Sequence, residues 1–369
     1  WPAYTVVNFV IMLGPSGDRL RAAASLSQFR VLCYQTSLKA KGLHRMEYVT
    51  LGRTGLRVSV AGLGCGGFSR LGFGTGKSEE EAIALVRQAL DLGVNLLDTA
   101  AVYGTERVVG QAIKNVPRDS VVIATKAWIP RREGRSAAER AVTSLDNSLR
   151  QLGTDYVDIF QLHGVSPAAY DQALDVIAPA LLKEREKGKL RFLGVTETGS
   201  SDPEHAMVRR AAEDGVWDVV MVAFHMMHQN ARTQVFPRTI ANRVGTLLMF
   251  AVRNIFSRPE RLATALRELT ASGQLPRWLA DAPNPLGFLI HAAGARTITE
   301  AAYRFVRHEP GVDVVLFGTG EPDHLQANIA SLLAPPLPSA DRQTLTKLFG
   351  RLVGVGLDPP YSMPGLSSA

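Results

Sequence analysis

Four residues of this chain supply a carboxylic acid, a phenol, an amine and an imidazole, the groups that most often hold and transfer protons in enzymes. They are Asp98, Tyr103, Lys126 and His163. Each lies at or just after the end of a short apolar run that is typical of a buried strand, with Tyr103 in the loop after the first run. The runs are residues 94–98, 121–126 and 157–163. Polar side chains at the carboxyl ends of successive parallel strands are the usual placement of an active site in an α/β barrel.

The residues around these four make the pattern specific. The segments Asp98-Thr-Ala-Ala-Val-Tyr103-Gly, Ala124-Thr-Lys126 and Gln161-Leu-His163 follow one another in the order Asp, Tyr, Lys, His. With these segments the chain resembles the aldo-keto reductases, from about residue 46 to about residue 349. The resemblance implies a single (β/α)8 TIM barrel and a catalytic tetrad made of the four residues. It also implies an NAD(P)H-dependent oxidoreductase that reduces aldehyde or ketone carbonyls to alcohols, or catalyses the reverse reaction.

The residue types fit that chemistry. Carbonyl reduction requires a polarised carbonyl oxygen and a proton for the new alkoxide, and Tyr103 is the expected general acid. A free tyrosine has a pKa near 10, so the ammonium of Lys126 is expected to lower it, with Asp98 as the counter-charge of Lys126. His163 is expected to donate a hydrogen bond to the carbonyl oxygen. The hydride must come from the cofactor, because no side chain supplies one.

Three alternatives stay open at this point. The strand-end charges could form an inert ion-pair network, although such a network does not require a tyrosine and a histidine in this order. Lys126 could be the nucleophile of a Schiff-base aldolase, but that chemistry prefers a depressed lysine pKa, which Asp98 would raise. The barrel could also bind cofactor as a regulatory or sensor subunit with little turnover, and the complete tetrad argues against this.

Positions for the nicotinamide are implied by the resemblance alone. Thr196 and Glu197 follow the fifth predicted strand, where family members hold the carboxamide, and Met221 stands where a glutamine often serves the same group. A glutamate accepts a hydrogen bond but does not donate one, and a methionine forms no strong hydrogen bond. Phe250 stands at the position of an aromatic ring that stacks on nicotinamide.

The phosphate and adenine end of the cofactor is matched by residues 318–328. The predicted contacts there are Gly318, Thr319, Gly320, His324 and Asn328. Discrimination in favour of NADP(H) needs a cation at the 2′-phosphate. This segment has neither Lys nor Arg, and it contains Glu321 and Asp323. We therefore expect NADP(H) binding with only a weak preference, and measurable use of NAD(H).

The elements that position these residues follow from alternating apolar runs and amphipathic segments. Strands are predicted over residues 58–64, 94–98, 121–126, 157–163, 190–195, 219–224, 246–252 and 312–317. Helices are predicted over residues 79–92, 106–113, 137–152, 170–187, 203–213, 259–272 with 297–308, and 322–333. Such alternation indicates a parallel sheet covered by helices, and eight units favour a closed barrel. The long stretch 253–294 is predicted to be an insertion near the site or an extra helix.

The ends of the chain are assigned separately. The turn Arg53-Thr54-Gly55 between two alternating runs predicts an N-terminal β-hairpin, which in the family closes the bottom of the barrel. The barrel domain is predicted to cover residues 46–350, and residues 351–369 to be a C-terminal loop or tail. Residues 1–45 are interpreted as an upstream extension that is disordered or non-native. A transit peptide is the alternative, because the segment is basic and poor in acids.

Three other motifs are rejected. The glycines at residues 62–67 match a dinucleotide loop, but about ten residues separate them from a helix that opens with the capping box Ser78–Glu81 and three carboxylates. Residues 72–78 miss the phosphate-loop spacing by one position. His225 and His228 have no third ligand with a defining spacing, so we predict no metal site.

Composition limits the partners. Residues 1–45 hold six basic residues and one acidic residue and account for +5 of the formal charge of +7. The nearly neutral remainder has no electrostatic footprint for nucleic acid, and no apolar run is long enough to span a membrane. Two cysteines fit a reducing compartment. We expect a cytoplasmic monomer or weak homo-oligomer whose partner is a small carbonyl substrate.

Overall fold

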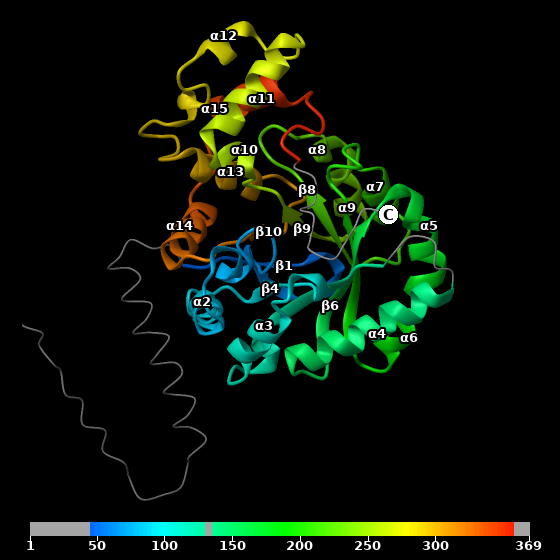
Figure 1. The fold of residues 1–369 in the computed structure, drawn as a ribbon. Helices are drawn as coiled ribbons and strands as arrows, with labels where there is room; N and C mark the ends of the chain where they lie inside the picture. The colour runs from blue at the N-terminus through cyan, green and yellow to red at the C-terminus, as the bar shows by residue number, and fades with distance from the viewer. Residues whose placement is uncertain (1–44, 130–134, 358–369) are drawn as a thin grey trace, which may run out of the picture. The chain divides into compact units, whose positions relative to one another are not determined.

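The computed structural model describes residues 45–129 and 135–357, with Arg135 described in its backbone only. Within these residues, eight parallel strands close into a barrel in the order β10-β3-β4-β5-β6-β7-β8-β9 (Figure 1). The strands are β3 (Ala61–Gly64), β4 (Leu96–Asp98), β5 (Val122–Ala127), β6 (Val157–Val165), β7 (Leu190–Glu197), β8 (Val219–Ala223), β9 (Gly245–Met249) and β10 (Val314–Phe317). The prediction of a (β/α)8 barrel is confirmed. Apart from Arg45, the predicted extension 1–45 lies outside the described residues, as do residues 358–369 of the predicted tail.

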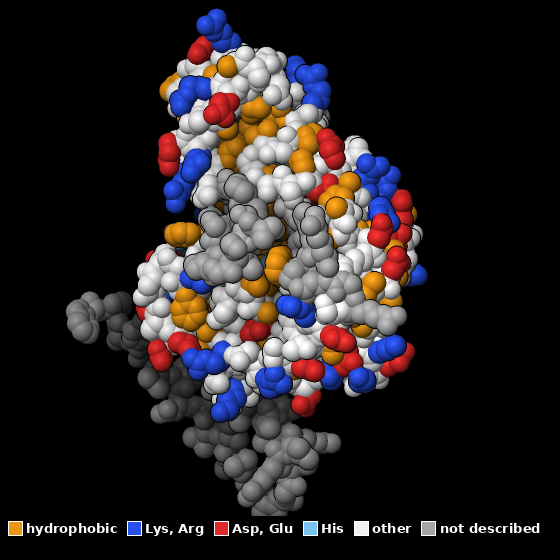
Figure 2. All heavy atoms as spheres, turned by 45° about the vertical axis from the view of Figure 1, so that its right-hand side comes forward, with side chains coloured by type: hydrophobic (Ala, Val, Ile, Leu, Met, Phe, Trp, Pro, Cys, Tyr) orange, Lys and Arg blue, Asp and Glu red, His pale blue; other side chains and the backbone are white. Residues whose placement is uncertain are grey.

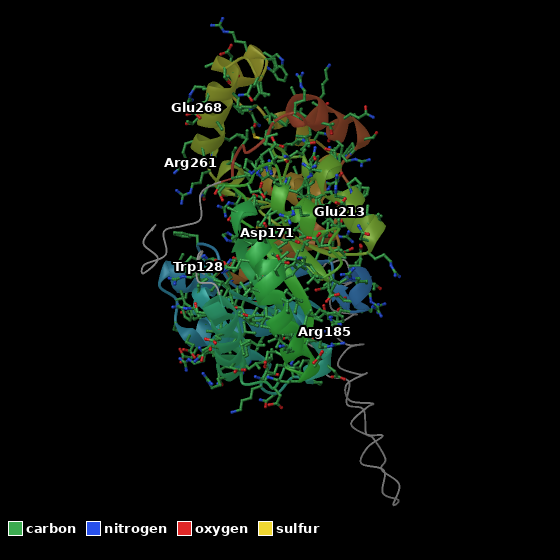
Figure 3. The ribbon with its side chains drawn as sticks, turned by 90° about the vertical axis from the view of Figure 1, so that its right-hand side faces the viewer. Trp128, Asp171, Arg185, Glu213, Arg261 and Glu268 are labelled. Atoms are coloured by element: carbon green, nitrogen blue, oxygen red, sulfur yellow. The ribbon has the colours of Figure 1, made fainter. Side chains whose placement is uncertain are left out.

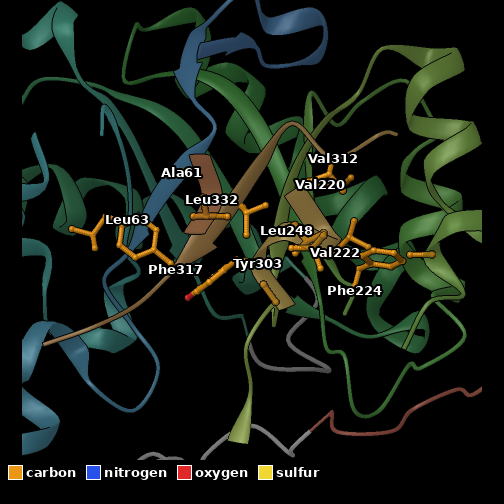
Figure 4. Packing of buried hydrophobic residues seen from close by; sticks show 14 of the residues in the cluster. Ala61, Leu63, Val220, Val222, Phe224, Leu248, Tyr303, Val312, Phe317 and Leu332 are labelled. Carbon is orange, nitrogen blue, oxygen red and sulfur yellow. The ribbon is translucent and has the colours of Figure 1, made fainter. Parts of the chain in front are cut away.

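The strands are buried on both faces. One set of side chains fills the inside of the barrel, including Leu96, Val122, Ile159, Val219 and Leu247. The alternate set packs outward against the helices. In Figure 4, this outer layer includes Val220, Val222, Leu248, Tyr303 and Leu332. Burial on both faces explains why the strand sequences are nearly continuous apolar runs.

Helices cover the outside of the barrel (Figure 1). They are α2 (Glu79–Asp91), α3 (Glu106–Ile113), α4 (Arg135–Leu152), α5 (Tyr170–Gln172), α6 (Ala178–Glu186), α7 (Ala206–Ala211), α8 (Ala231–Gln234), α9 (Phe236–Asn242), α10 (Asn254–Ser257), α11 (Pro259–Ala271), α12 (Arg277–Asp281), α13 (Ile298–Arg307), α14 (Pro322–Leu333) and α15 (Ser339–Phe349). A π-helical segment, Ala173–Ile177, joins α5 to α6 where one helix is predicted. The predicted capping box is present at α2, where Ser78 Oγ accepts from Glu81 N and the Glu81 carboxylate accepts from Ser78 N at 2.8 Å. Because α2 begins there and not at the glycines of residues 62–67, these glycines do not form a dinucleotide loop.

The stretch 253–294 contains the predicted extra helix. Its helices α10, α11 and α12 lie with α15 in the upper part of Figure 1. Helix α11 buries Leu262, Leu266 and Leu269, while Arg261 and Glu268 project away from it (Figure 3). The sequence pattern does not predict α15, which buries only two apolar side chains, Leu345 and Phe349.

The predicted hairpin closes the amino-terminal end of the barrel. Its strands β1 (Tyr48–Thr50) and β2 (Arg57–Ser59) pair antiparallel. Leu51, Leu56 and Val58 belong to the same apolar cluster as the inner side chains of the barrel. From the turn, the Arg53 guanidinium donates to Asp218 Oδ1 at 3.2 Å and to the carbonyl oxygens of Gly215 and Trp217. These contacts hold the hairpin against the residues that precede β8.

The first predicted strand differs most from the structure. Residues 58–64 were expected as a single strand, but they are divided between β2 and β3. The Ser59 hydroxyl donates to Ala61 O at 2.7 Å, and Asn95 Oδ1 accepts from Ser59 N at 2.7 Å. These two bonds, one local and one to a residue 36 positions away, accompany the turn of the chain out of the hairpin and into the barrel, which a continuous apolar run does not reveal.

Two surface properties bear on partners. In the described ranges, no helix combines the length and apolar character needed to cross a membrane. On the face drawn in Figure 2, basic and acidic side chains are interspersed. That face therefore gives no support to a nucleic-acid surface, which would need clustered cations.

Candidate active site

The four predicted catalytic residues meet at the carboxyl ends of three neighbouring strands. Asp98 ends β4, Lys126 lies near the end of β5, and His163 lies near the end of β6. Tyr103 ends a short 3-10 turn, η3 (Ala101–Tyr103), that follows β4. The Lys126 Nζ atom lies 2.7 Å from Asp98 Oδ2, and the Tyr103 hydroxyl lies 3.3 Å from His163 Nε2. The fold thus brings together four side chains that are spread over a stretch of 66 residues, from Asp98 to His163.

Close contacts on both sides of the loop place Tyr103 in this position. A Cβ atom at Gly66 would lie 2.4 Å from the Tyr103 ring, so only glycine leaves room for the ring. Gly104 has a φ of 70°, a conformation that favours glycine, and it turns the chain from η3 toward α3. The hydroxyls of Thr99 and Thr105 are 2.9 Å apart and join the two ends of the loop. These contacts limit the positions that the phenol can take.

Lys126 is a fully buried cation. It is 0% exposed, and besides Asp98 it donates to the carbonyl oxygen of Thr99 at 2.8 Å. Burial lowers the pKa of Lys126, but the carboxylate of Asp98 and the neighbouring Tyr103 together more than offset this, and the net pKa lies above the ordinary value. The ammonium lies 5.0 Å from the centre of the Tyr103 ring. A lasting positive charge is therefore held beside the phenol.

Tyr103 differs from the expectation in one respect. The sequence predicts that Lys126 lowers the pKa of this phenol below its ordinary value. In the structure, burial raises the pKa of Tyr103, and the charge of Lys126 opposes this rise without cancelling it. The cause is that the same closed barrel mouth that holds the ammonium also removes the phenol from water. Lys126 limits the cost of phenolate formation here, and Tyr103 stays protonated.

His163 is uncharged. Burial, together with the positive charge of Lys126, lowers the pKa of His163 to about 3. Its ring stands edge-on to the Tyr103 ring at 5.4 Å between centres. Its Nδ1 atom is buried and has no hydrogen-bond partner among the described residues. A neutral imidazole carries one N–H, and placing it on Nε2 avoids a buried Nδ1–H without an acceptor; Nε2 then faces the Tyr103 hydroxyl at 3.3 Å.

The carboxamide positions are only partly suited to that role. The Thr196 hydroxyl accepts from Gly164 N at 2.7 Å, so it holds the backbone directly after His163 and keeps its own proton to donate. Met221 points into the barrel within the inner apolar cluster. Glu197 accepts from Ala223 N at 2.6 Å and pairs with His205 at 2.8 Å. The structure gives both Glu197 oxygens internal partners, so its predicted contact with the carboxamide stays a prediction without structural support.

Phe250 follows β9 and presents an aromatic face near the end of β7. Its φ of 73° is unusual for a residue other than glycine. A Cβ atom at Gly199 would lie 2.8 Å from the ring, so the backbone after β7 packs closely against Phe250. The guanidinium of Arg253 lies 4.1 Å from the ring centre. The predicted stacking ring is thus held on one side by backbone and contacted by a cation.

The predicted phosphate segment lies between β10 and α14. Gly318 is exposed, and the Thr319 hydroxyl accepts from Glu321 N at 3.0 Å. A Cβ atom at Gly320 would lie 2.5 Å from Gly72 Cα, so no side chain fits at position 320. Farther along α14, His324 is exposed and Asn328 is half-buried.

A cation that sequence reasoning missed lies beside this segment. Lys77, in the loop before α2, pairs with Glu321 at 2.9 Å between Nζ and Oε2. The two residues are 244 positions apart, so spacing alone gives no signal of their contact. Gln161 was also missed as a site residue, although its place two residues before His163 puts it on the same side of β6.

No metal site is apparent in the part of the chain that the structure describes. The rings of His225 and His228 are 5.9 Å apart. Their Nδ1 atoms accept from the backbone N–H groups of Met227 and Gly354, which leaves those atoms engaged within the protein.

Comparison with known proteins agrees with this geometry. The model of the "Aldo/keto reductase family" matches residues 62–349. The chain belongs to the aldo/keto reductase family. It is therefore an oxidoreductase. The family match spans β3 to α15, so it includes each predicted tetrad residue.

Individual relatives cover nearly the whole barrel. L-galactose dehydrogenase of Arabidopsis thaliana is 31% identical over 82% of this chain and 93% of its own length. The aldo-keto reductase YhdN of Bacillus subtilis is 27% identical over 86% of this chain and 98% of its own. A crystal structure of an aldo-keto reductase from Klebsiella pneumoniae in complex with NADPH is 25% identical, with a TM-score of 0.59 over 88% of this chain and 99% of that one.

Proposed function

We propose that this reductase transfers hydride between NAD(P)(H) and an aldehyde or ketone, with Tyr103 as the general acid in the direction of reduction. The observation that carries the proposal is the convergence of the Tyr103 hydroxyl and His163 Nε2, 3.3 Å apart, beside the buried Lys126–Asp98 pair. An inert ion-pair network would not need a phenol and a neutral imidazole aimed at one point.

The two donors define the place of the substrate. A carbonyl oxygen that lies within hydrogen-bond distance of both would be polarised by His163 Nε2–H and would receive the proton of Tyr103. The cofactor, when bound, supplies the hydride. As the proton leaves Tyr103, the Lys126 ammonium stabilises the phenolate in a site where water does not screen the charge. In the oxidation direction, the phenolate would take the proton back from the alcohol.

Several of the predicted positions have residues that fit a nicotinamide cofactor. Thr196 retains a hydroxyl proton for the carboxamide, and the Phe250 ring packs closely against Gly199. Gly318 is open at the predicted phosphate end. The NADPH bound to the Klebsiella pneumoniae relative supports the same cofactor class here. Because Met221 cannot anchor the carboxamide and Glu197 is engaged elsewhere, stacking and apolar contact must contribute more of the binding.

The alternative is a barrel that binds cofactor and acts as a regulatory or sensor subunit. The test is the oxidation of NADPH and of NADH by the purified chain with a panel of aldehydes and ketones, and the reverse reaction with alcohols and aldose sugars. Turnover with any carbonyl well above the rate without protein supports the reductase. Tight cofactor binding without turnover across the panel would favour the regulatory alternative.

Cofactor choice follows from the pair of Lys77 and Glu321. Position 320 admits no side chain, and the charge of Lys77 is neutralised by Glu321. We therefore expect a weak preference for NADP(H). Replacing Glu321 with Gln should free Lys77 for the 2′-phosphate and raise the preference for NADP(H) over NAD(H) by about tenfold. Replacing Lys77 with Met should lower the preference. Dissociation constants from nicotinamide fluorescence, with kcat/KM for both cofactors, measure the change.

Asp323→Asn is the matched control for that experiment. Asp323 is an exposed acid on the first turn of the same helix, and its removal changes the local charge by the same amount as Glu321→Gln. An equal shift in both variants would mean that general charge, and not the release of Lys77, sets the preference. An unchanged preference in Glu321→Gln would remove Lys77 from the cofactor site.

A further inference from the structure

Gln161 is a buried amide that the tetrad does not account for. It lies on β6 two residues before His163, so the two side chains leave the strand on the same side. Across the sheet its partners in register are Lys126 on β5 and Gly194 on β7. The residue is 0% exposed. The Gln161 amide therefore lies inside the barrel, next to the ion pair of Asp98 and Lys126.

The neighbouring strand leaves space for this side chain. A Cβ atom at Gly194 would lie 2.9 Å from Gln161 Cγ and 3.0 Å from the carbonyl oxygen of Val219. Because the second contact is with backbone, the strand could not move aside easily. Gly194 is therefore required if Gln161 is to lie across the barrel toward β4.

In the Gln161 amide, the nitrogen has a hydrogen-bond partner within the described ranges and the oxygen has none. Gln161 Nε2 donates to Asp98 Oδ1 at 3.3 Å, while the other carboxylate oxygen accepts from Lys126 at 2.7 Å. Each oxygen of Asp98 thus has its own donor. The amide oxygen Oε1 is buried and has no partner among the described residues. An unpaired buried oxygen costs free energy that an apolar side chain of the same length would avoid, so the donor is the part of the amide with a role.

We propose that Gln161 is a positioning residue that keeps the Asp98 carboxylate ionised and turned toward Lys126, so that Lys126 remains charged beside Tyr103. This proposal rests on the proposed carbonyl reduction. In a dry site, a neutral carboxylic acid with a neutral amine competes with the charged pair. A hydrogen bond from the amide to Oδ1 is stronger when Asp98 is ionised than when it is a neutral acid, and it therefore favours the charged pair.

The sign of the effect on Tyr103 follows from the positions of the charges. Lys126 opposes the burial that raises the pKa of Tyr103, and Asp98 adds to the rise by a smaller amount. Loss of the Gln161 donor favours transfer of the Lys126 proton to Asp98, which removes both charges. The pKa of Tyr103 then rises, so the phenol stays protonated to higher pH but becomes a weaker acid.

The main variant is Gln161→Met, which keeps the length of the side chain and removes the donor. With 4-nitrobenzaldehyde and NADPH, we expect kcat to fall about tenfold or more, while the dissociation constant of NADPH changes less than about threefold. The alkaline limb of the profile of log kcat/KM against pH should move upward by about one unit. A variant that keeps more than half of kcat with an unmoved limb overturns the proposal.

Gln161→Glu gives an independent reading. When its carboxyl group is protonated, it can donate to Asp98 Oδ1 as the amide does, and when it is ionised it cannot. We therefore expect Gln161→Glu to exceed Gln161→Met in activity at pH 5.5 and to lose that advantage by pH 8. Equal activity of the two variants at both pH values would count against a donor role.

Tyr170→Phe is the control for loss of a buried hydrogen bond. The Tyr170 hydroxyl donates to Asp214 at 2.6 Å and accepts from Trp217, away from the tetrad. Tyr170→Phe should lower the melting temperature without moving the alkaline limb of the profile of log kcat/KM against pH. If the unmodified chain shows no turnover, the proposed function fails, and the phenolate absorbance of Tyr103 still tests Gln161. That signal is the difference between each protein and its Tyr103→Phe form, and it should appear at higher pH in Gln161→Met; an unchanged midpoint overturns the proposal.

Discussion

Replacing Tyr103 with phenylalanine will lower kcat/KM for carbonyl reduction by about 10²- to 10⁴-fold, the range that a positioned general acid contributes. The hydroxyl is the proton donor that stands 3.3 Å from His163 Nε2 and beside Lys126. The ring itself fills the space above Gly66, and phenylalanine retains it. Cofactor binding and the melting temperature should therefore remain close to those of the unmodified chain. Steady-state kinetics and nicotinamide fluorescence measure the two effects separately.

Tyr303→Phe is the matched control for that substitution. Tyr303 is also a buried tyrosine, but it lies on α13 in the outer apolar layer of the barrel. It should keep nearly full activity. If Tyr103→Phe retains more than about a tenth of kcat, another group donates the proton and the assignment of Tyr103 is wrong.

Replacing Lys126 with methionine will both inactivate and destabilise the protein. The substitution leaves Asp98 buried without its cation, which typically costs about 3–5 kcal/mol of unfolding free energy. Activity should fall at least as far as in Tyr103→Phe, because no positive charge then stabilises the phenolate. Chemical denaturation monitored by circular dichroism measures the loss of stability.

The loss of stability in Lys126→Met should depend on pH in a defined direction. Burial raises the pKa of Asp98, opposed by Lys126 and Gln161, so removal of Lys126 raises that pKa further. A carboxyl group whose pKa is higher in the folded state destabilises the fold only where it is ionised when unfolded. The destabilisation of Lys126→Met should therefore be small near pH 4, grow as the pH rises above the ordinary aspartate pKa toward the raised pKa of Asp98, and level off above it.

The double variant Asp98→Asn with Lys126→Met separates the two effects. It removes both charges, so most of the stability should return while the activity stays lost. If the single variant is as stable as the unmodified chain at pH 8, Asp98 has found another partner or water. If the double variant recovers activity, the ion pair is not part of the catalytic machinery.

The local sequence predicts most of the fold and the membership of the tetrad. Strands buried on both faces must be continuous apolar runs, so β4, β5 and β6 are recognisable from the sequence. Once the strands are recognised, the polar residues at their ends are recognised too. The start of α2 follows from Ser78 and Glu81, because a capping box involves only residues three positions apart. The division of residues 58–64 and the helix α15 depend on weaker local signals, and the sequence did not predict them.

Tertiary structure decides the properties that depend on residues distant in the chain. The pKa of Tyr103 depends on the balance between burial and a nearby ammonium, and composition does not show which is larger. Glu197 is occupied by His205 and by the backbone of β8, and Lys77 meets Glu321 across 244 positions. The residue types at the strand ends can be recognised from the sequence alone, since strand periodicity is local. Only closure of the barrel decided which of them touch, how far each is removed from water, and therefore which charges persist.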